Sequence, residues 1–381
     1  MNHQKQRASS KQIRVLIAAP SLDINGGQAR QAVRLIEKLS REPEIEVSFI
    51  PHNPRLPRSM RWMQQIKYVR TVATTTVYIA MLIARVWRYD IVHVFSASYY
   101  SYLLSALPAI LIAKLYGRKT ILNYRSGEAE DHLANWRTAV PTIRLADVTV
   151  VPSGYLVEVF ARFGLRARAI FNTVETDRFR YRKRSGVRPV FLTSRLLEPL
   201  YNVACALRAF AIIQARYPEA RLTIAADGSL REELERLARD LKLRDAQFIG
   251  FVSFEDMPAL YDAADIYLNT NDIDNMPSSL IECMAAGVNI VTTNAGGIPY
   301  IVTDEETGLI VPCGDHEAMA RSAMRFLEDT QMAAQTAARA HDECRKYNWA
   351  TARREWLGLY KELANRRVAV SSNHASAAES L

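Results

Sequence analysis

Short apolar runs alternate with longer stretches of helical spacing along the first half of the chain. The apolar runs have the length of β-strands, and the stretches between them repeat their apolar positions every three or four residues. This alternation predicts βαβ units, parallel sheets and an α/β fold class. In chain order the segments are Ile13 to Ala18, Gln28 to Leu39, Val47 to Ile50, Ile91 to Phe95, Leu103 to Leu115, Thr120 to Asn123 and Val148 to Pro152.

The alternation begins again after a charged segment, 178–189, which contains Gly and Pro residues and is typical of an interdomain linker. We therefore expect an N-terminal domain at 12–180, a linker at 181–189 and a C-terminal domain at 190–348. A helical pattern at 349–365 either caps the second domain or crosses back to the first, and 1–11 and 366–381 are expected to be disordered tails. The second series runs Val190 to Thr193, Val203 to Arg216, Arg221 to Ala225, Leu230 to Leu241, Ala246 to Ile249, Met257 to Ala264, Asp265 to Thr270 and Asn289 to Thr292.

The charge of the chain is unevenly distributed. Residues 1–185 contain 29 Lys and Arg but only 13 Asp and Glu, a balance of +16, whereas the remainder has a balance of −7. A basic half indicates an anionic partner, and without a zinc finger or a base-reading helix we exclude nucleic acid. Trp62, Tyr68 and Trp87 lie among the basic residues and favour peripheral contact with an anionic membrane at its inner face. A basic surface without a partner is the alternative.

The cysteines indicate a reducing compartment. All four lie in the second half at wide spacings that match neither a zinc site nor a small disulfide framework. Residues 1–11 also lack the apolar region of a signal peptide. We therefore expect reduced thiols in a cytoplasmic protein.

Two carboxylates, Asp274 and Glu282, stand eight residues apart across a predicted junction between a strand and a helix. Pro277, Ser278 and Ser279 between them are typical of a helix start. Backbone N–H groups at such a start face the carboxyl end of the strand, where parallel sheets bind ligands and where phosphate is favoured. This junction suits a nucleotide diphosphate.

Further polar segments follow the other predicted strands, and together they resemble a known family. The segments include Gly26-Gly27, Ser194-Arg195-Leu196 and Asp227-Gly228, and the resemblance also involves 172–179, 249–252, 281–287, 296–299 and 307–309. In this order and spacing the chain resembles the family 4 retaining glycosyltransferases over about 13–356. The resemblance implies the GT-B fold, in which two Rossmann-like domains with parallel sheets face each other across a cleft.

The resemblance also implies roles for individual residues in binding a UDP- or GDP-linked sugar. Glu282 would accept hydrogen bonds from the ribose hydroxyls, and Arg195 would hold the donor diphosphate and neutralise the leaving group. Asp274 takes the place of the first Glu in the family's Glu-x7-Glu pattern, which faces the donor sugar, but its side chain is one methylene shorter. The alternatives are a solvated Glu282, an ordinary loop carboxylate at Asp274 and a structural ion pair for Arg195. The remaining candidate donor-binding residues are Gly26, Gly27, Asp227, Gly228, Pro277, Ser278 and Ser279.

Two positions depart from the family's pattern. Leu200 stands where the family usually has a Lys five residues after the diphosphate-binding Arg, and Arg125 stands where many members have a His. An arginine cannot act as a base near neutral pH, so Arg125 is expected to be an electrostatic group of the catalytic site. Glu128 is a candidate acceptor-side carboxylate, and so is Glu130, with surface exposure as the alternative for both.

No metal cofactor is expected. Asp272 and Asp274 imitate an Asp-x-Asp metal site of another glycosyltransferase fold, but two carboxylates make a poor cage for a cation. The resemblance implies a retaining glycosyltransferase whose N-terminal domain holds the acceptor, and the basic, apolar N-terminal half suggests a lipid-linked or polysaccharide precursor as that acceptor. A nucleotide-sugar 2-epimerase and a catalytically silent nucleotide-sugar-binding subunit remain alternatives.

Overall fold

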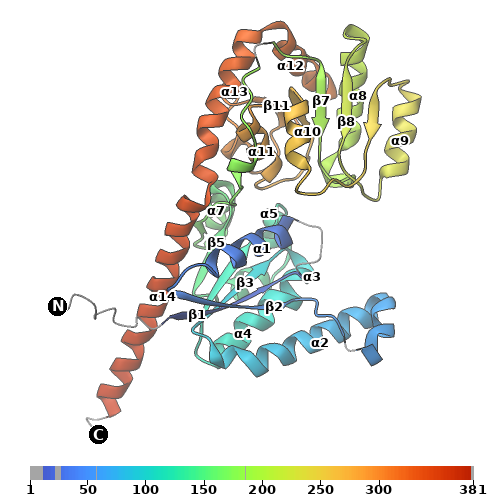
Figure 1. Cartoon of the computed structure of the whole chain (residues 1–381). Helices are drawn as coiled ribbons and strands as arrows, with labels where there is room; N and C mark the ends of the chain where they lie inside the picture. The colour runs from blue at the N-terminus through green and yellow to red at the C-terminus, as the bar shows by residue number, and fades with distance from the viewer. Residues whose placement is uncertain (1–11, 22–26, 57, 185, 379–381) are drawn as a thin grey trace, which may run out of the picture. The chain divides into compact units, whose positions relative to one another are not determined.

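The computed structural model describes residues 12–21, 27–56, 58–184 and 186–378, and it divides the chain into two compact units (Figure 1). Unit 1 contains the residues up to 152, then 156–171, and the residues from 352 on. Unit 2 contains 153–155 and 172–351. Each unit is built on one six-stranded sheet in which every strand pair is parallel.

The sheet of unit 1 has the strand order β2-β1-β3-β4-β5-β6. Its strands are β1 (Ile13–Ala19), β2 (Ile45–Pro51), β3 (Ile91–Ser96), β4 (Lys119–Tyr124), β5 (Val148–Val151) and β6 (Arg168–Ala169). Every residue of β3 is buried, as expected for a parallel strand with helices on both faces. Figure 1 shows α1 on one face of this sheet and α2 with α4 on the other. The strand order reverses between β1 and β3, which is where such sheets form a ligand crevice.

The remaining elements of unit 1 are helices of varied length. They are α1 (Gly27–Leu39), η1 (Arg58–Gln65), α2 (Lys67–Arg85), η2 (Val86–Arg88), α3 (Tyr99–Ser101), the π-helix η3 (Tyr102–Ala106), α4 (Leu107–Leu115), α5 (Ala129–Asn135), α6 (Ala139–Ile143) and α7 (Gly154–Arg162). Among the described residues one helix, Tyr68–Arg88, is long and apolar enough to cross a membrane by length and composition, and 22% of its apolar window is buried.

The last helix, α14 (Trp349–Ala378), belongs to unit 1 from residue 352 on. Its Arg353 donates two hydrogen bonds of 2.6 Å to the carboxylate of Glu42, and Tyr360 and Trp356 pack on His93 of β3. The backbone of 366–378 continues this helix, whereas a disordered tail is expected over 366–381. The difference has a physical reason, because extending a helix that is already nucleated costs little and this segment is rich in alanine.

The sheet of unit 2 has the strand order β12-β11-β10-β7-β8-β9. Its strands are β7 (Val190–Thr193), β8 (Arg221–Ile224), β9 (Ala246–Phe248), β10 (Ile266–Asn269), β11 (Asn289–Thr293) and β12 (Leu309–Val311). If β7 is counted as the first strand, this is the 3-2-1-4-5-6 order of dinucleotide-binding sheets, with its switch point between β7 and β10. The loops that follow β7 and β10 are therefore neighbours, although 79 residues separate Arg195 from Asp274.

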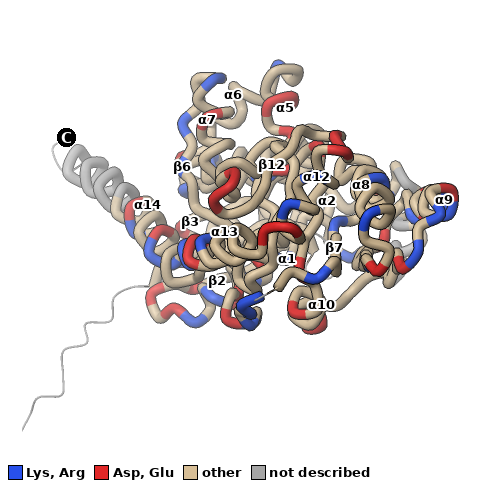
Figure 2. Tube along the Cα trace, turned by 90° about the horizontal axis from the view of Figure 1, so that it is seen from above, with Lys and Arg blue, Asp and Glu red and all other residues tan. Residues whose placement is uncertain are grey.

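Helices of unit 2 enclose an apolar core that includes Phe191, Phe210 and Leu268. Figure 2 shows acidic and basic residues side by side on α9, whose buried residues are Leu234 and Ala238. The helices are η4 (Thr176–Arg178), η5 (Pro199–Tyr201), α8 (Val203–Arg216), α9 (Arg231–Asp240), α10 (Met257–Ala263), α11 (Ser278–Ala286), η6 (Ile298–Tyr300), α12 (His316–Glu328), α13 (Thr330–Cys344) and η7 (Arg345–Tyr347).

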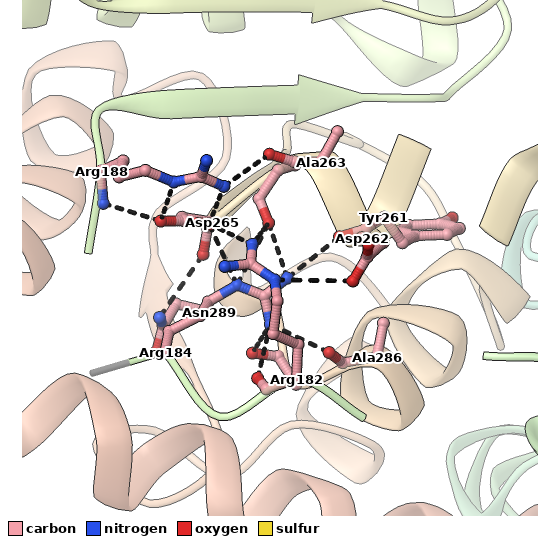
Figure 3. A network of polar contacts seen from close by, with 11 residues as sticks. Arg182, Arg184, Arg188, Tyr261, Asp262, Ala263, Asp265, Ala286 and Asn289 are labelled. Atoms are coloured by element: carbon pink, nitrogen blue, oxygen red, sulfur yellow. Dashed lines mark hydrogen bonds and ion pairs between the residues drawn. The ribbon is translucent and has the colours of Figure 1, made fainter. Parts of the chain in front are cut away.

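The expected linker is a packed part of unit 2, and residues 172–180 belong to the same unit. Figure 3 shows the reason: Arg182, Arg184 and Arg188 converge on the carboxylate of Asp265 at the start of β10. Only 1% of the Arg184 side chain is exposed. Burial alone would raise the pKa of Asp265, but hydrogen bonds from Arg188 and Arg182 outweigh it and lower this pKa to about 2. This group of four residues is called the arginine clamp below.

Candidate functional site

The loops at the switch point of unit 2 bring Arg195 and Asp274 into direct contact. Nη2 of Arg195 lies 2.6 Å from Oδ2 of Asp274, and only 16% and 13% of the two side chains are exposed. Asn271 donates a second hydrogen bond of 2.6 Å to the same oxygen, and the backbone N–H of Asn275 donates one of 2.7 Å to Oδ1. The carboxylate is therefore fixed from three directions.

Arg195 retains hydrogen-bonding capacity in this arrangement. Its guanidinium lies 4.4 Å from the centre of the Tyr201 ring, a cation–π contact, and its Nε has no hydrogen-bond partner among the described residues. Burial alone would lower the pKa of Arg195, but the charge of Asp274 outweighs burial and raises it. The side chain thus stays cationic, and its buried Nε is a donor without a partner among the described residues.

Glu282 is joined to the same site through a chain of hydroxyl groups. Tyr261 donates a hydrogen bond of 2.9 Å to Oε2 of Glu282, and its hydroxyl lies 3.4 Å from Oγ of Ser194. Ser194 lies 2.9 Å from the hydroxyl of Tyr267 and directly precedes Arg195. Burial raises the pKa of Tyr261 well above its ordinary value, and the charge of Glu282 adds to this effect. The hydroxyl chain that ends at Glu282 and the ion pair of Arg195 with Asp274 thus meet at the adjacent residues Ser194 and Arg195.

The start of α11 is held in place by close backbone contacts. Pro277 precedes Ser278 and Ser279, and no side chain caps the helix at Pro277. Gly297 donates its N–H to the carbonyl of Asp274 at 3.0 Å. A Cβ at Gly297 would come within 1.9 Å of the carbonyl oxygen of Asn275, so only glycine allows this approach. The loop that carries Asp274 is thus rigidly positioned.

The turn at Asp227 and Gly228 interlocks with the loop after β7. Leu197 donates its N–H to the carbonyl of Asp227 at 3.1 Å, and a Cβ at Gly228 would lie 2.5 Å from the Leu197 carbonyl oxygen. The carboxylate of Asp227 is exposed and accepts a hydrogen bond from the N–H of Gly228. The side chain of Leu200, on η5, is 41% exposed and places no cation at the position of the family's Lys.

The candidate residues of unit 1 gather at the carboxyl ends of β3 and β4. The side chain of Gln28, at the start of α1, and the backbone N–H of Arg125 both donate to the carbonyl of Ser96, at 2.9 and 3.0 Å. Gly27 is the first residue of α1, whereas Gly26 lies outside the described residues. Glu128 is exposed at the N-terminus of α5.

Two further residues of unit 1 have structural partners. Glu130 forms an exposed ion pair of 2.8 Å with Arg162. His93 is buried between Phe95 and Trp356, with Tyr360 at 2.8 Å from Nδ1 and Asn123 at 3.0 Å from Nε2. Burial lowers the pKa of His93 to about 3, and the charge of Arg125 contributes. His93 is therefore a neutral, buried residue that packs against Tyr360.

Several residues of the network lie outside the sequence prediction. Tyr261 and Tyr267 stand at helical and strand positions that are typical of core residues, so no signal singles them out. Asn271 could be found from its place in a polar run directly after a strand. Within the part of the chain that the structure describes, no group of three or more His, Cys, Asp or Glu residues is arranged to hold a metal ion.

The two parallel sheets and the site at the switch point define the class of protein. The structure of Anabaena Alr3699/HepE in complex with UDP and glucose is similar, with a TM-score of 0.71 at 18% identity over 92% of this chain and all of that chain. A sucrose-phosphate synthase from Thermosynechococcus elongatus gives a TM-score of 0.68 at 17% identity, covering 92% of this chain and 99% of that one. The predicted GT-B fold class is confirmed.

The sequence comparison gives a family match for part of the chain. Residues 174–343 match the family described as "Glycosyl transferases group 1". The resemblance to family 4 glycosyltransferases is thereby confirmed at the level of the family.

Two curated relatives come from mycobacteria. A phosphatidyl-myo-inositol mannosyltransferase of Mycolicibacterium smegmatis is 27% identical over 50% of this chain and 49% of its own length. A GDP-mannose-dependent alpha-(1-6)-phosphatidylinositol monomannoside mannosyltransferase of Mycobacterium tuberculosis is 29% identical over 58% of this chain and 61% of its own length. The chain thus aligns with about half to three fifths of these two relatives.

Proposed function

We propose that the chain is a retaining glycosyltransferase that moves a sugar from a UDP- or GDP-linked donor to an acceptor. The observation that carries this proposal is the polar network at the switch point of unit 2, where Arg195, Asp274 and Glu282 converge. Unit 2 would bind the donor, with the ribose hydroxyls on Glu282 and the diphosphate on Arg195. The start of α11, at Pro277, Ser278 and Ser279, would offer its backbone N–H groups to phosphate.

The chemistry of transfer follows from these positions. As the glycosidic bond breaks, negative charge develops on the departing diphosphate, and a guanidinium stabilises this charge better than it stabilises the intact donor. Asp274 would accept hydrogen bonds from hydroxyls of the donor sugar. Because Nη2 of Arg195 already contacts Asp274, one residue pair would position the sugar and its leaving group together.

The relatives support a nucleotide sugar as the donor without deciding its base. The Anabaena protein was solved in complex with UDP and glucose, whereas the mycobacterial enzyme is GDP-mannose-dependent. The full chain should therefore be incubated with UDP- and GDP-sugars and a membrane extract. We expect release of one nucleoside diphosphate, and loss of this release in Arg195→Ala and Glu282→Ala. Arg236→Ala, an exposed residue of α9, is the matched control.

The same assay separates the alternative functions. An epimerase would return an isomerised nucleotide sugar without releasing a nucleoside diphosphate, and a silent subunit would return the donor unchanged. Full activity in both site variants, with their folding verified by circular dichroism, would contradict the assignment of the site.

We also propose that unit 1 contacts an anionic membrane and binds a lipid-linked or polysaccharide-precursor acceptor there. Tyr68 and Val72 of α2 are 78% and 68% exposed, and Trp87 of η2 is 49% exposed. The sequence between Glu46 and Asp90 contains no acidic residue. Exposed apolar side chains in a segment of basic residues favour the interface of an anionic bilayer.

Vesicle sedimentation tests the membrane proposal. We expect the full chain to bind vesicles that contain phosphatidylglycerol and to bind pure phosphatidylcholine much more weakly, with the difference reduced by salt. Trp87→Glu should weaken this binding, whereas Ile249→Glu, at an exposed apolar residue of unit 2, should not. Equal binding to both kinds of vesicle would refute the electrostatic part of the proposal.

A further inference from the structure

We propose that Arg125 of unit 1 binds an oxyanion, a phosphate or carboxylate group, carried by a substrate of the reaction. This inference rests on the proposed function, since it specifies which chemical group the second unit recognises. The group comes either from the acceptor, which would then be an anionic molecule, or from the diphosphate of the donor.

The first observation is a guanidinium without a counter-ion. The side chain of Arg125 makes one hydrogen bond, from Nη1 to the side-chain oxygen of Asn123 at 3.2 Å, and lies 5.3 Å from the centre of the Phe95 ring. No carboxylate in the described parts of the chain forms an ion pair with it. Burial lowers the pKa of Arg125 to about 9, with no acidic neighbour to oppose the effect.

The sequence around Arg125 explains why no counter-ion is present. Between Glu46 and Glu128 the chain contains a single acidic residue, Asp90, and this residue pairs with Arg14 at 3.2 Å. Glu128 is exposed on α5, and the next carboxylate, Glu130, pairs with Arg162. Of the acidic residues nearest to Arg125 in the sequence, Asp90 and Glu130 are thus paired with other arginines, and Glu128 is exposed.

Folding around a half-buried cation that has no counter-ion is unfavourable. Removing a charged group from water is unfavourable unless a partner of opposite charge replaces the lost hydration, and structural arginines normally have such a partner. The arginine clamp of unit 2 shows the structural case, because Asp265 contacts all three of its arginines. Arg125 lacks such a partner among the described residues, so we assign the negative charge to a ligand.

The second observation is the position of Arg125 in the sheet. It follows β4, and its backbone N–H shares the carbonyl of Ser96 with the side chain of Gln28. The start of α1 and the end of β3 flank the switch point of unit 1, where sheets of this order form their ligand crevice. The first turn of α1 contains no acidic residue, so the positive end of the helix dipole adds to the field of Arg125.

A set of thermal unfolding measurements tests the inference. The full-length wild type, Arg125→Met and Arg125→Lys are unfolded with increasing inorganic phosphate, and Arg137→Met, an exposed residue of the same unit, is the control. We expect phosphate to stabilise the wild type and the control. Arg125→Met should weaken phosphate binding by roughly 10- to 100-fold. Arg125→Lys should bind phosphate with intermediate affinity.

The ligand-free proteins give a second readout. Replacement of a structural arginine would destabilise the protein. Removal of a half-buried cation that has no counter-ion should leave the melting temperature of Arg125→Met unchanged or raised. A strong destabilisation, or an undiminished response of Arg125→Met to phosphate, would overturn the inference.

Repeating the phosphate titration with saturating UDP or GDP distinguishes the two sources of the anion. If Arg125-dependent stabilisation by phosphate persists, the site is free for the acceptor's anionic group. If the nucleotide abolishes it and Arg125→Met weakens nucleotide binding, the donor diphosphate is the ligand. Failure of the wild type to bind either nucleotide, with the phosphate response retained, would contradict the proposed function and leave the anion site standing.

Discussion

Replacement of Arg184 by methionine tests whether the arginine clamp holds unit 2 together. The Arg184 side chain donates hydrogen bonds to the carboxylate of Asp265 and to five backbone carbonyls, those of Tyr261, Ala264, Ala286, Gly287 and Arg182. A buried ion pair alone can often be replaced by apolar residues without loss of stability. Here most of the acceptors are main-chain groups, which no side-chain substitution can remove.

The expected loss of stability can be worked out from the backbone carbonyls that would lose a hydrogen-bond donor in Arg184→Met. Ala286 also accepts from the backbone N–H of Arg182, and Ala264 also accepts from the Arg182 side chain. Tyr261, Gly287 and Arg182 have no such second donor among the described contacts, and of these three only the contacts with Tyr261 and Gly287 are fully buried. Leaving a buried acceptor unsatisfied costs about 1–3 kcal/mol, so Arg184→Met should lower the free energy of unfolding of unit 2 by about 2–6 kcal/mol. Domains are stable by about 5–15 kcal/mol, so the loss is a large part of the total.

Urea denaturation combined with hydrogen exchange measures this effect. Exchange of the amides of β10 and α11 should accelerate in Arg184→Met, while β1 and β3 of unit 1 should keep their protection. Arg188→Met is the matched control, because its side chain is 54% exposed and contacts the same carboxylate. Its cost should stay near 1 kcal/mol. If the two variants lose equal stability, or Arg184→Met loses less than about 0.5 kcal/mol, the reasoning from unsatisfied carbonyls is wrong.

Three further predictions concern pH, loop geometry and the missing cation. His93 and His132 are buried and neutral, with pKa values lowered by burial to about 3 and about 4, whereas an unfolded histidine titrates near 6.5. Below pH ~6.5 these histidines bind protons in the unfolded state but not in the folded state. Each histidine should therefore lower the free energy of unfolding of unit 1 by up to about 1.4 kcal/mol per pH unit, until the pH reaches its folded pKa. Hydrogen exchange measured at pH 7 and 4.5 should show unit 1 losing protection before unit 2. Gly297→Ala should weaken UDP or GDP binding roughly tenfold or more, because the new Cβ would collide with the Asn275 carbonyl and displace the loop that contains Asp274. Calorimetry measures this affinity, and an unchanged value would refute the role of the loop. Leu200→Lys should tighten nucleoside diphosphate binding several-fold at low salt and lose this gain at high salt, and an affinity independent of salt would show that position 200 does not face the phosphates.

The fold was predictable because its determinants are local. The expected helix Val203 to Arg216 has the observed bounds of α8, and the expected strand Val190 to Thr193 has those of β7. Alternation of strands and helices is a property of neighbouring residues, and right-handed crossovers leave few ways to join them. Helix α2 was not expected as a helix, because its outward face is also apolar and it lacks the one-sided pattern of a half-buried helix.

The unit boundary could not be predicted from composition. The Arg-rich segment 181–189 has the composition of a solvated linker, yet Arg184 is buried because carbonyls at the ends of α10 and α11 supply its acceptors. Every residue has a backbone carbonyl, so the sequence does not indicate which carbonyls will accept hydrogen bonds from Arg184. The partners of the segment 181–189 can therefore be identified only when the strand order is known, because that order places Asp265 beside the segment.

The candidate site shows the same division between local and tertiary information. The positions of Asp274 and Glu282 at a strand-to-helix junction follow from nearby residues, and β10 and α11 confirm this junction. The contact of Arg195 with Asp274 depends on β7 and β10 being neighbours in the sheet, which no local pattern encodes. Resemblance to a family supplied that information, while the supporting tyrosines remained indistinguishable from core residues.

The ion pair between Arg195 and Asp274 has a consequence for selectivity under the proposed function. A phosphate that enters the site shares Arg195 with a carboxylate that is already bound to it at 2.6 Å, so phosphate alone gains less than it would from a free guanidinium. A donor that also offers sugar hydroxyls can hydrogen-bond to Asp274 and compensate for this competition. The pair therefore discriminates against bare phosphate and favours a ligand in which a diphosphate and a sugar are joined. Arg125 has no carboxylate partner and lacks this discrimination, which is why inorganic phosphate is a suitable probe for unit 1 and a poor one for unit 2.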